Sequence, residues 1–257
     1  MSGVIQTFTL HSIFQRTEQL VRVMLPSGYN ESTPRRAVYV LPTSAGMPAE
    51  HGDPMLILRD LDAATRHGVI LVQPLYEIEP WFGDHATDPA VRQASYLRDA
   101  VVPFVEERFA TTQSAEGRLL FGCSKSGWGA FSLILHDPDF YGYAAAWDAP
   151  MMFDQFYYGM GAVFGTQERL DEFRPHLLAA KQAAHFRGRP RLVLAGEKAW
   201  GTMIPTAAGG SHTAEYHALL DQHRIAHVYD DTLRCEHKWL AAWMEPVLAT
   251  LVGLGAR

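Results

Sequence analysis

Residues 119–130 read Leu-Leu-Phe-Gly-Cys-Ser-Lys-Ser-Gly-Trp-Gly-Ala, and this stretch decides the fold. Its first three residues form the apolar run of a buried strand, and residues 128–136 are apolar enough to predict a helix packed under a sheet. Between them lies a tight turn of small residues with Ser124 at its centre. Gly122 and Ser126 flank it at a distance of two residues, where strand and helix approach closely and only small side chains fit.

This strand, turn and helix resemble the nucleophile elbow of α/β-hydrolases, G-x-S-x-G, with Ser126 in place of the second glycine. The main alternative for a turn rich in Gly and Ser is a phosphate-binding loop, but the chain contains no G-x-x-x-x-G-K-[ST] run. Ser124 is therefore the candidate nucleophile, and the backbone N–H of Lys125 is a candidate oxyanion donor. We expect Cys123 to be a small buried residue, because the elbow buries the positions beside the serine.

Length and composition favour one globular domain over residues 1–257. Hydrophobic residues make up 47% and charged residues 19%, which suits a sizeable core. The net charge of -6 gives no reason to expect nucleic acid or an anionic membrane as a partner. Neither a signal peptide nor a membrane-spanning run is apparent, and two cysteines do not make a disulfide framework. We expect a cytoplasmic protein, and a homo-oligomer is compatible with these features.

Apolar strands alternate with helical patterns from residue 37 to the end of the chain. We expect strands at residues 6–14, 19–25, 37–41, 69–72, 119–121, 143–147, 191–195 and 226–230. We expect helices at residues 55–67, 93–109, 128–136, 167–186, 211–223 and 238–252. This order predicts an α/β fold with a mainly parallel sheet of about eight strands, helices on both faces and an antiparallel hairpin at one edge.

Several segments in the same order resemble the putative esterase family of α/β-hydrolases, which includes esterase D, feruloyl esterases and mycolyltransferase antigens. The resemblance covers nearly the whole chain. It rests on residues 21–29, a strand running into Pro-Ser-Gly-Tyr; residues 81–84, Trp-Phe-Gly-Asp; the helix at 96–109; the elbow; residues 138–140, Pro-Asp-Phe; and residues 236–239, Glu-His-Lys-Trp. One departure is the third strand, which ends in Pro42-Thr43-Ser44 instead of the family's His-Gly.

A serine hydroxyl needs a base within hydrogen-bond reach and a third group that orients the base. Among the 12 histidines, His237 has the expected position, after the last strand and before the last helix, although an ordinary surface histidine would also fit there. His223 and His227 have the spacing of metal ligands, but the helix ends between them. We therefore expect no metal and no other cofactor.

Two carboxylates compete for the place of the catalytic acid, and we favour Asp148 over Glu197 as the acceptor of the Nδ1–H of His237. The family pattern Gly-x-x-Asp after the strand at 191–195 has Ala199 where the aspartate belongs, which leaves Glu197 as a substitute. Asp148 follows the preceding strand, and some hydrolases of this fold carry their acid there; its alternative is a turn aspartate before Pro150. Glu236, adjacent to His237, is a weaker third candidate.

The remaining candidate residues surround this centre. The second oxyanion donor should come from Thr43 or Ser44, in the loop after the third strand. Trp81 and Phe82, in a long aromatic loop, and Met151 and Met152 are candidate pocket residues. The two methionines begin a segment, residues 149–187, that forms either a pocket wall or lid, or ordinary core.

These features favour a serine hydrolase that acts on small carboxylic esters through an acyl-enzyme. The same machinery could transfer the acyl group to another alcohol. A non-catalytic binding protein on a hydrolase scaffold is a third interpretation, because Ser126, the missing His-Gly and the unassigned acid all depart from the family pattern.

Overall fold

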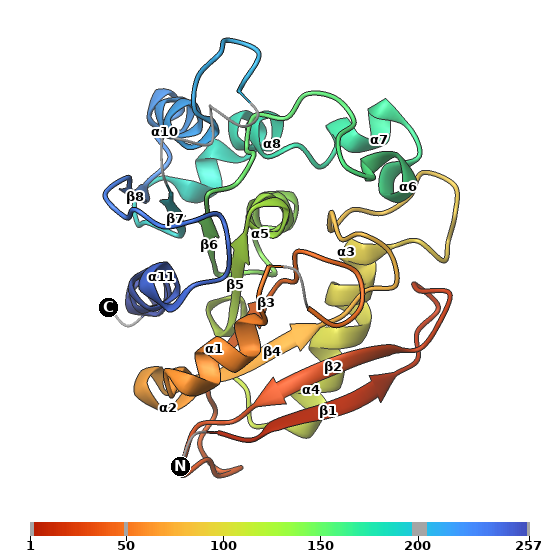
Figure 1. Ribbon diagram of the computed structural model, residues 1–257, viewed down its shortest axis with the longest axis vertical. Coiled ribbons are helices and arrows are strands. Elements are labelled where there is room, and N and C mark those ends of the chain that lie inside the picture. The colour runs from red at the N-terminus through yellow and green to blue at the C-terminus, as the bar shows by residue number, and fades with distance from the viewer. Residues whose placement is uncertain (1–2, 49–50, 197–204, 256–257) are drawn as a thin grey trace.

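The computed structural model describes residues 3–48, 51–196 and 205–255, and its strands form a single sheet in the order β1-β2-β4-β3-β5-β6-β7-β8 (Figure 1). The strands are β1 Ile5–Leu10, β2 Gln19–Met24, β3 Ala37–Val40, β4 Ile70–Pro74, β5 Arg118–Cys123, β6 Tyr143–Trp147, β7 Leu192–Ala195 and β8 His227–Asp230. Strands β1 and β2 form an antiparallel hairpin, and β2 also pairs antiparallel with β4. The six strands β3 to β8 are parallel to one another. The predicted α/β architecture is confirmed.

Helices cover both faces of the sheet (Figure 1). They are α1 Pro54–Asp60, α2 Ala63–His67, α3 Gln93–Tyr96, α4 Val102–Arg108, α5 Lys125–His136, α6 Met160–Phe164, α7 Gln167–Asp171, α8 Pro175–Gln182, α10 His212–Gln222 and α11 Ala241–Leu254, with a π turn η1 Leu97–Val101 and the short 3-10 turns η2 Ala115–Gly117 and η3 Ala183–Phe186. On one face, α1, α2 and α11 bury residues such as Leu58, Ala64 and Trp243. On the other, α4, α5, α8 and α10 bury their apolar sides in a second core.

Three of the expected helices are interrupted, and for the helix at 93–109 Pro103 predicts the interruption. Residues 55–67 form two helices because Asp62 takes a left-handed conformation, with φ 51°. The helix at 93–109 contains the π turn η1, in which the N–H of Val102 donates to the carbonyl of Leu97. Pro103 follows directly and has no N–H to continue the regular hydrogen bonding. Residues 167–186 break at Pro175, since the residue before a proline is driven out of the helical region.

Aromatic side chains join the long connection between β6 and β7 to the rest of the molecule. This connection contains α6, α7 and α8 and contributes Phe153, Phe164 and Phe173 to a satellite core around Trp81 and Trp128. Because Trp128 lies on α5, the helix that follows Ser124, the satellite core supports the elbow from its side.

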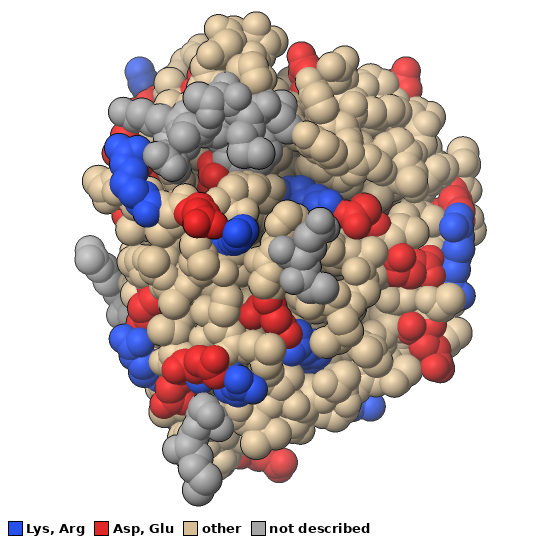
Figure 2. Space-filling model, viewed as in Figure 1, with Lys and Arg blue, Asp and Glu red and all other residues tan. Residues whose placement is uncertain are grey.

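Charged side chains of both signs are intermixed on the face seen in Figure 2. Among the described residues, no helix combines the length and the apolar character that crossing a bilayer would require.

Candidate active site

Ser124 occupies a strained turn between β5 and α5, with φ 54° and ψ -130°. A Cβ at Gly122 would overlap the backbone carbonyl of Ser126, so only glycine fits there. Ser126 is accommodated because its hydroxyl bonds back to the strand, donating to the carbonyl of Cys123 (2.8 Å) and accepting its N–H (2.9 Å). The serine in place of the usual glycine therefore makes its own bonds to the elbow.

Helix α5 begins directly after the candidate nucleophile, three residues earlier than the apolar pattern predicts. The carbonyl of Ser124 accepts the N–H of Trp128 at 3.0 Å, which includes residues 125–127 in the first turn. The first N–H groups of a helix have no partner within it and carry partial positive charge. The N–H of Lys125 belongs to this turn and can donate to an anion beside Ser124.

Asp148 leaves the sheet beside Ser124. The pairing of β5 with β6 sets Cys123 opposite Trp147, so the next residue of each strand emerges at the same edge. Asp148 has a positive φ of 44°, and its N–H donates to the carbonyl of Ala195 at 2.8 Å. Gly196 follows β7 and leaves room for this turn, because a Cβ there would lie 2.6 Å from the backbone nitrogen of Asp148.

His237 lies on the loop between β8 and α11 and is bound to Asp148. Its Nδ1 is 2.7 Å from Oδ2 of Asp148, and the two side chains are 24% and 7% exposed. A carboxylate oxygen can only accept, so Nδ1 carries the hydrogen and the lone pair of neutral His237 is on Nε2. This tautomer is the one that a general base requires.

Ser124 and His237 line the same small cavity, of about 30 Å³. Its other lining residues are Thr43, His51, Cys123, Lys125 and Lys238. Thr43 is buried, and its hydroxyl oxygen accepts the indole N–H of Trp239 at 3.3 Å. Burial raises the pKa of the Cys123 thiol well above its usual range, so this cysteine stays protonated and is a poor nucleophile.

Other expected site residues lie elsewhere. Ser44 is not among the described residues that line the cavity. Trp81 and Phe82 are buried: the indole N–H of Trp81 donates to the carbonyl of Tyr158, and the Phe82 ring packs closely on Gly129 of α5. These aromatic rings complete the core beneath the elbow, which explains why a long loop carries them.

The two methionines also belong to the scaffold around the site. Met151 is fully buried in the core beneath α4, α5, α8 and α10, and Met152 is packed against that core. The backbone N–H of Met152 donates to Nδ1 of His212 at 3.1 Å. Neither methionine is among the described residues that line the cavity with Ser124.

The alternative acids differ in what can be said of them. Glu197 lies outside the described residues. Glu236 is exposed and forms an ion pair with Lys238 at 2.9 Å, and this hydrogen bond lowers its pKa. Of the described carboxylates considered as the acid, Asp148 is the one that the structure hydrogen-bonds to His237.

His51 and Lys238 are cavity residues that the sequence did not indicate. Lys238 could have been inferred from its place next to His237. His51 has no local signal, because it is held by a contact between distant segments: its carbonyl accepts the N–H of Trp239 at 3.0 Å.

Comparisons with known proteins give one family model and several structures of the same fold. A family model described as "Putative esterase" matches residues 77–249. The S-formylglutathione hydrolase from Agrobacterium tumefaciens is 15% identical, with a TM-score of 0.76 over 100% of this chain and 96% of that one. MPT51 from Mycobacterium tuberculosis is 15% identical, with a TM-score of 0.74 over 98% of both chains. An S-formylglutathione hydrolase from Staphylococcus aureus is 16% identical, with a TM-score of 0.72 over 99% of this chain and 100% of that one. A search of the curated proteins gave no match.

Proposed function

The chain belongs to the putative esterase family, and from this membership we propose that it cleaves small carboxylic esters through an acyl-enzyme formed on Ser124. One observation carries the proposal. Asp148 accepts the Nδ1 hydrogen bond of His237, and His237 shares a cavity with a serine held in a strained elbow.

In the proposed first half-reaction, the Oγ of Ser124 attacks the ester carbonyl while Nε2 of His237 takes its proton. Asp148 keeps the ring oriented and stabilises the imidazolium. His237 then returns the proton to the departing alcohol, which leaves the acyl group on Ser124. In the second half-reaction, water takes the place of Ser124 Oγ as nucleophile and the carboxylic acid is released.

The oxyanion of each tetrahedral intermediate needs donors that are already in place. We assign the first to the backbone N–H of Lys125. The second is the Thr43 hydroxyl: its oxygen accepts from Trp239, so its own hydrogen is available for donation. This hydroxyl would do the work of the donor that the family draws from the same loop, where this chain lacks His-Gly.

The size of the cavity favours a short acyl group. Measured in the same way, one water molecule needs at least roughly 10–15 Å³, so a cavity of about 30 Å³ has room for only a small group beside Ser124. A formyl or acetyl group fits beside Ser124 with little rearrangement, whereas an aromatic acyl group requires the walls to move. Residues 149–187 are the proposed wall of the larger substrate site, since they begin directly after Asp148 and expose Phe156 and Tyr158.

Labelling with a fluorophosphonate probe tests the nucleophile. We expect the wild-type chain and Ser27→Ala to be labelled equally, because Ser27 is an exposed serine far from Ser124 in the sequence. Ser124→Ala should lose the label and the initial burst with p-nitrophenyl acetate. A wild-type chain without label or burst would identify a binding protein, and a labelled Ser124→Ala variant would place the nucleophile elsewhere.

Acyl transfer is distinguished from hydrolysis by its products. With p-nitrophenyl acetate and excess glycerol, a hydrolase releases mainly acetate, whereas a transferase produces glycerol acetate in an amount that rises with the alcohol concentration.

A further inference from the structure

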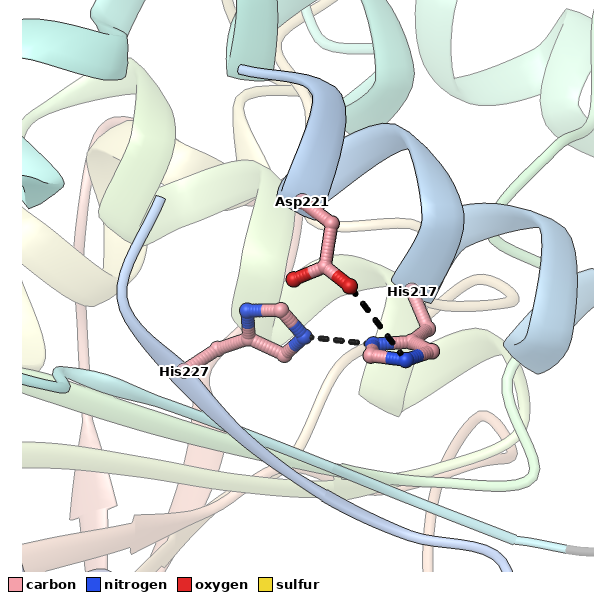
Figure 3. Close-up of side chains that lie close together, drawn as sticks. All are labelled: His217, Asp221 and His227. Atoms are coloured by element: carbon pink, nitrogen blue, oxygen red, sulfur yellow. Dashed lines mark hydrogen bonds and ion pairs between the residues drawn. The ribbon is translucent and has the colours of Figure 1, made fainter. Parts of the chain in front are cut away.

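Three side chains of types that can bind a metal ion lie close together beside β8, the strand at one edge of the sheet (Figure 3). His217 and Asp221 are one helical turn apart on α10, and His227 is the first residue of β8. One ligand atom from each residue lies within 4.8 Å of the others. We propose that this cluster binds a divalent first-row transition metal, with Zn²⁺ as the natural occupant.

His227 is already oriented as a ligand. Its Nδ1 lies 2.8 Å from the carbonyl oxygen of Ile225, which can only accept, so Nδ1 carries the hydrogen. Nε2 therefore presents its lone pair toward the cluster. Metal-bound histidines commonly donate their other N–H to a backbone carbonyl, which fixes the tautomer and the direction of the ring.

His217 contacts both of the other residues. Its Nδ1 is 2.8 Å from Nε2 of His227, and its Nε2 is 3.5 Å from Oδ2 of Asp221. Its ring is stacked on Tyr229, with centroids 4.2 Å apart, which fixes the ring plane. Because Nε2 of His227 has no hydrogen, a proton on His217 fills the space between the rings, and a metal ion would replace that proton.

The two histidine nitrogens need to move little to bind an ion, whereas Asp221, whose Oδ2 lies 3.5 Å from Nε2 of His217, must turn toward it. Two zinc–nitrogen bonds of about 2.0–2.1 Å at a tetrahedral angle put the nitrogens roughly 3.4 Å apart. The two rings therefore have to separate by about half an ångström. The side chain of His217 is 34% exposed, so it can move outward without disturbing the core.

The donor set selects the class of metal. Two imidazoles and one carboxylate suit zinc, cobalt, nickel and copper, whereas calcium and magnesium prefer sites made of oxygen ligands. Three protein ligands leave a position for water. None of the three lines the cavity beside Ser124, so this site is separate from the proposed catalytic residues. The bound ion would pin α10 to the edge strand that leads into the His237 loop.

Zinc titration of the chelator-treated full chain, without an added histidine tag, tests the site. We expect calorimetry to give one equivalent for the wild-type chain and for His223→Gln, which changes a histidine at the end of α10 outside the cluster. His217→Ala and His227→Ala should each weaken zinc binding by at least about 100-fold, since loss of an outer-shell partner alone costs about 10–100-fold. Saturating zinc should raise the melting temperature of the two binding proteins by several degrees and leave the cluster variants unchanged.

Asp221→Asn keeps the test decisive, because the carboxylate is 63% exposed and its loss cannot disturb the core. It should also weaken zinc binding, and Co²⁺ bound to the wild-type chain should show visible absorption bands that this variant loses. A wild-type chain that binds no zinc would reduce the cluster to a hydrogen-bonded histidine pair. Equal binding by every variant would identify adventitious binding to other histidines. Either result overturns the proposal.

Discussion

Two non-glycine residues with left-handed backbone conformations follow neighbouring strands. Ser124 has φ 54° and Asp148 has φ 44°, and each such conformation costs roughly 1–3 kcal/mol. A glycine leaves room for each turn: a Cβ at Gly122 would collide with the backbone of Ser126, and one at Gly196 with the backbone of Asp148. Strain of this kind persists where the surrounding structure imposes it, and here it directs both side chains to the same edge of the sheet.

The acid is tested by comparing two amide variants. Asp148→Asn should reduce kcat/KM on p-nitrophenyl acetate by about 10⁴, because an amide holds the ring but favours the wrong tautomer. Glu197→Gln should stay within about tenfold of the wild-type value, and His237→Ala should lose about three orders of magnitude or more. An inactive Glu197→Gln enzyme beside an active Asp148→Asn enzyme would reverse the assignment. Two active amide variants would indicate a Ser–His dyad.

The hydroxyl of Ser126 should contribute to stability. Ser126→Ala leaves the buried N–H of Cys123 without the hydroxyl that it donates to, which costs about 1–3 kcal/mol. Chemical denaturation should show this loss in the free energy of unfolding, with the exposed Ser27→Ala variant within about 0.5 kcal/mol of wild type. If Ser126→Ala unfolds at the same denaturant concentration as wild type, the hydroxyl only occupies space.

At the scale of elements, Trp239 ties together the two loops that face Ser124. Its backbone N–H donates to the carbonyl of His51, and its indole N–H donates to the hydroxyl of Thr43. His51 and Thr43 belong to the loop between β3 and α1, whereas Trp239 follows His237. A movement of one loop therefore disturbs the other, which makes Trp239 a positioning residue for both the base and the proposed oxyanion donor.

Trp239→Phe removes the indole N–H and keeps an aromatic ring. We expect kcat on p-nitrophenyl acetate to fall by about tenfold with KM nearly unchanged, because the oxyanion donor acts in the transition state. Thr43→Val breaks the same hydrogen bond from the other side. If the bond is what matters, the double variant should be no worse than Thr43→Val alone. Additive losses would show that Trp239 acts independently of Thr43.

The sequence predicted the elements with local signals and missed those that depend on distant contacts. The buried runs at β3, β6 and β7 are legible because their strands are apolar throughout, and the family resemblance is confirmed by the family model. The break at Asp62 has no signal in the periodicity, whereas Pro103 predicts an interruption of its helix but not that it takes the form of a π turn. The hydrogen bond between Asp148 and His237 joins residues 89 positions apart. The order of the strands favoured Asp148 over Glu197, but only the strand register brings its side chain to the histidine.

At the scale of the whole molecule, one core contains several buried tyrosines. Five tyrosines are buried in the core covered by α4, α5, α8 and α10: Tyr39, Tyr76, Tyr96, Tyr141 and Tyr216. Burial raises the pKa of each above its usual value of 10.0. The hydroxyls of the first four have no hydrogen-bond partner among the described residues, so no hydrogen bond offsets the effect of burial.

These tyrosines predict alkaline unfolding. In the unfolded chain they ionise near pH 10, whereas in the folded chain they keep their protons, so the unfolded state binds fewer protons and stability falls as the pH rises above 10. Each buried group costs on the order of 1 kcal/mol by pH 11, and five together cost several kcal/mol, a large part of the stability of many domains. The stability is fully present below pH 10. Denaturation with guanidinium at pH 8 and pH 10.5 should show the loss.

A matched variant separates this effect from general alkaline damage. Tyr76→Phe removes a buried hydroxyl that has no partner among the described residues, so at pH 8 it should be as stable as wild type or more stable. At pH 11 it should retain on the order of 1 kcal/mol more than wild type, because one fewer phenol ionises on unfolding. Absorbance at 295 nm gives an independent measure: of the 10 tyrosines, the five buried in this core should ionise only with the loss of structure. Ten phenols that titrate together near pH 10 in the folded chain would contradict the burial of this core.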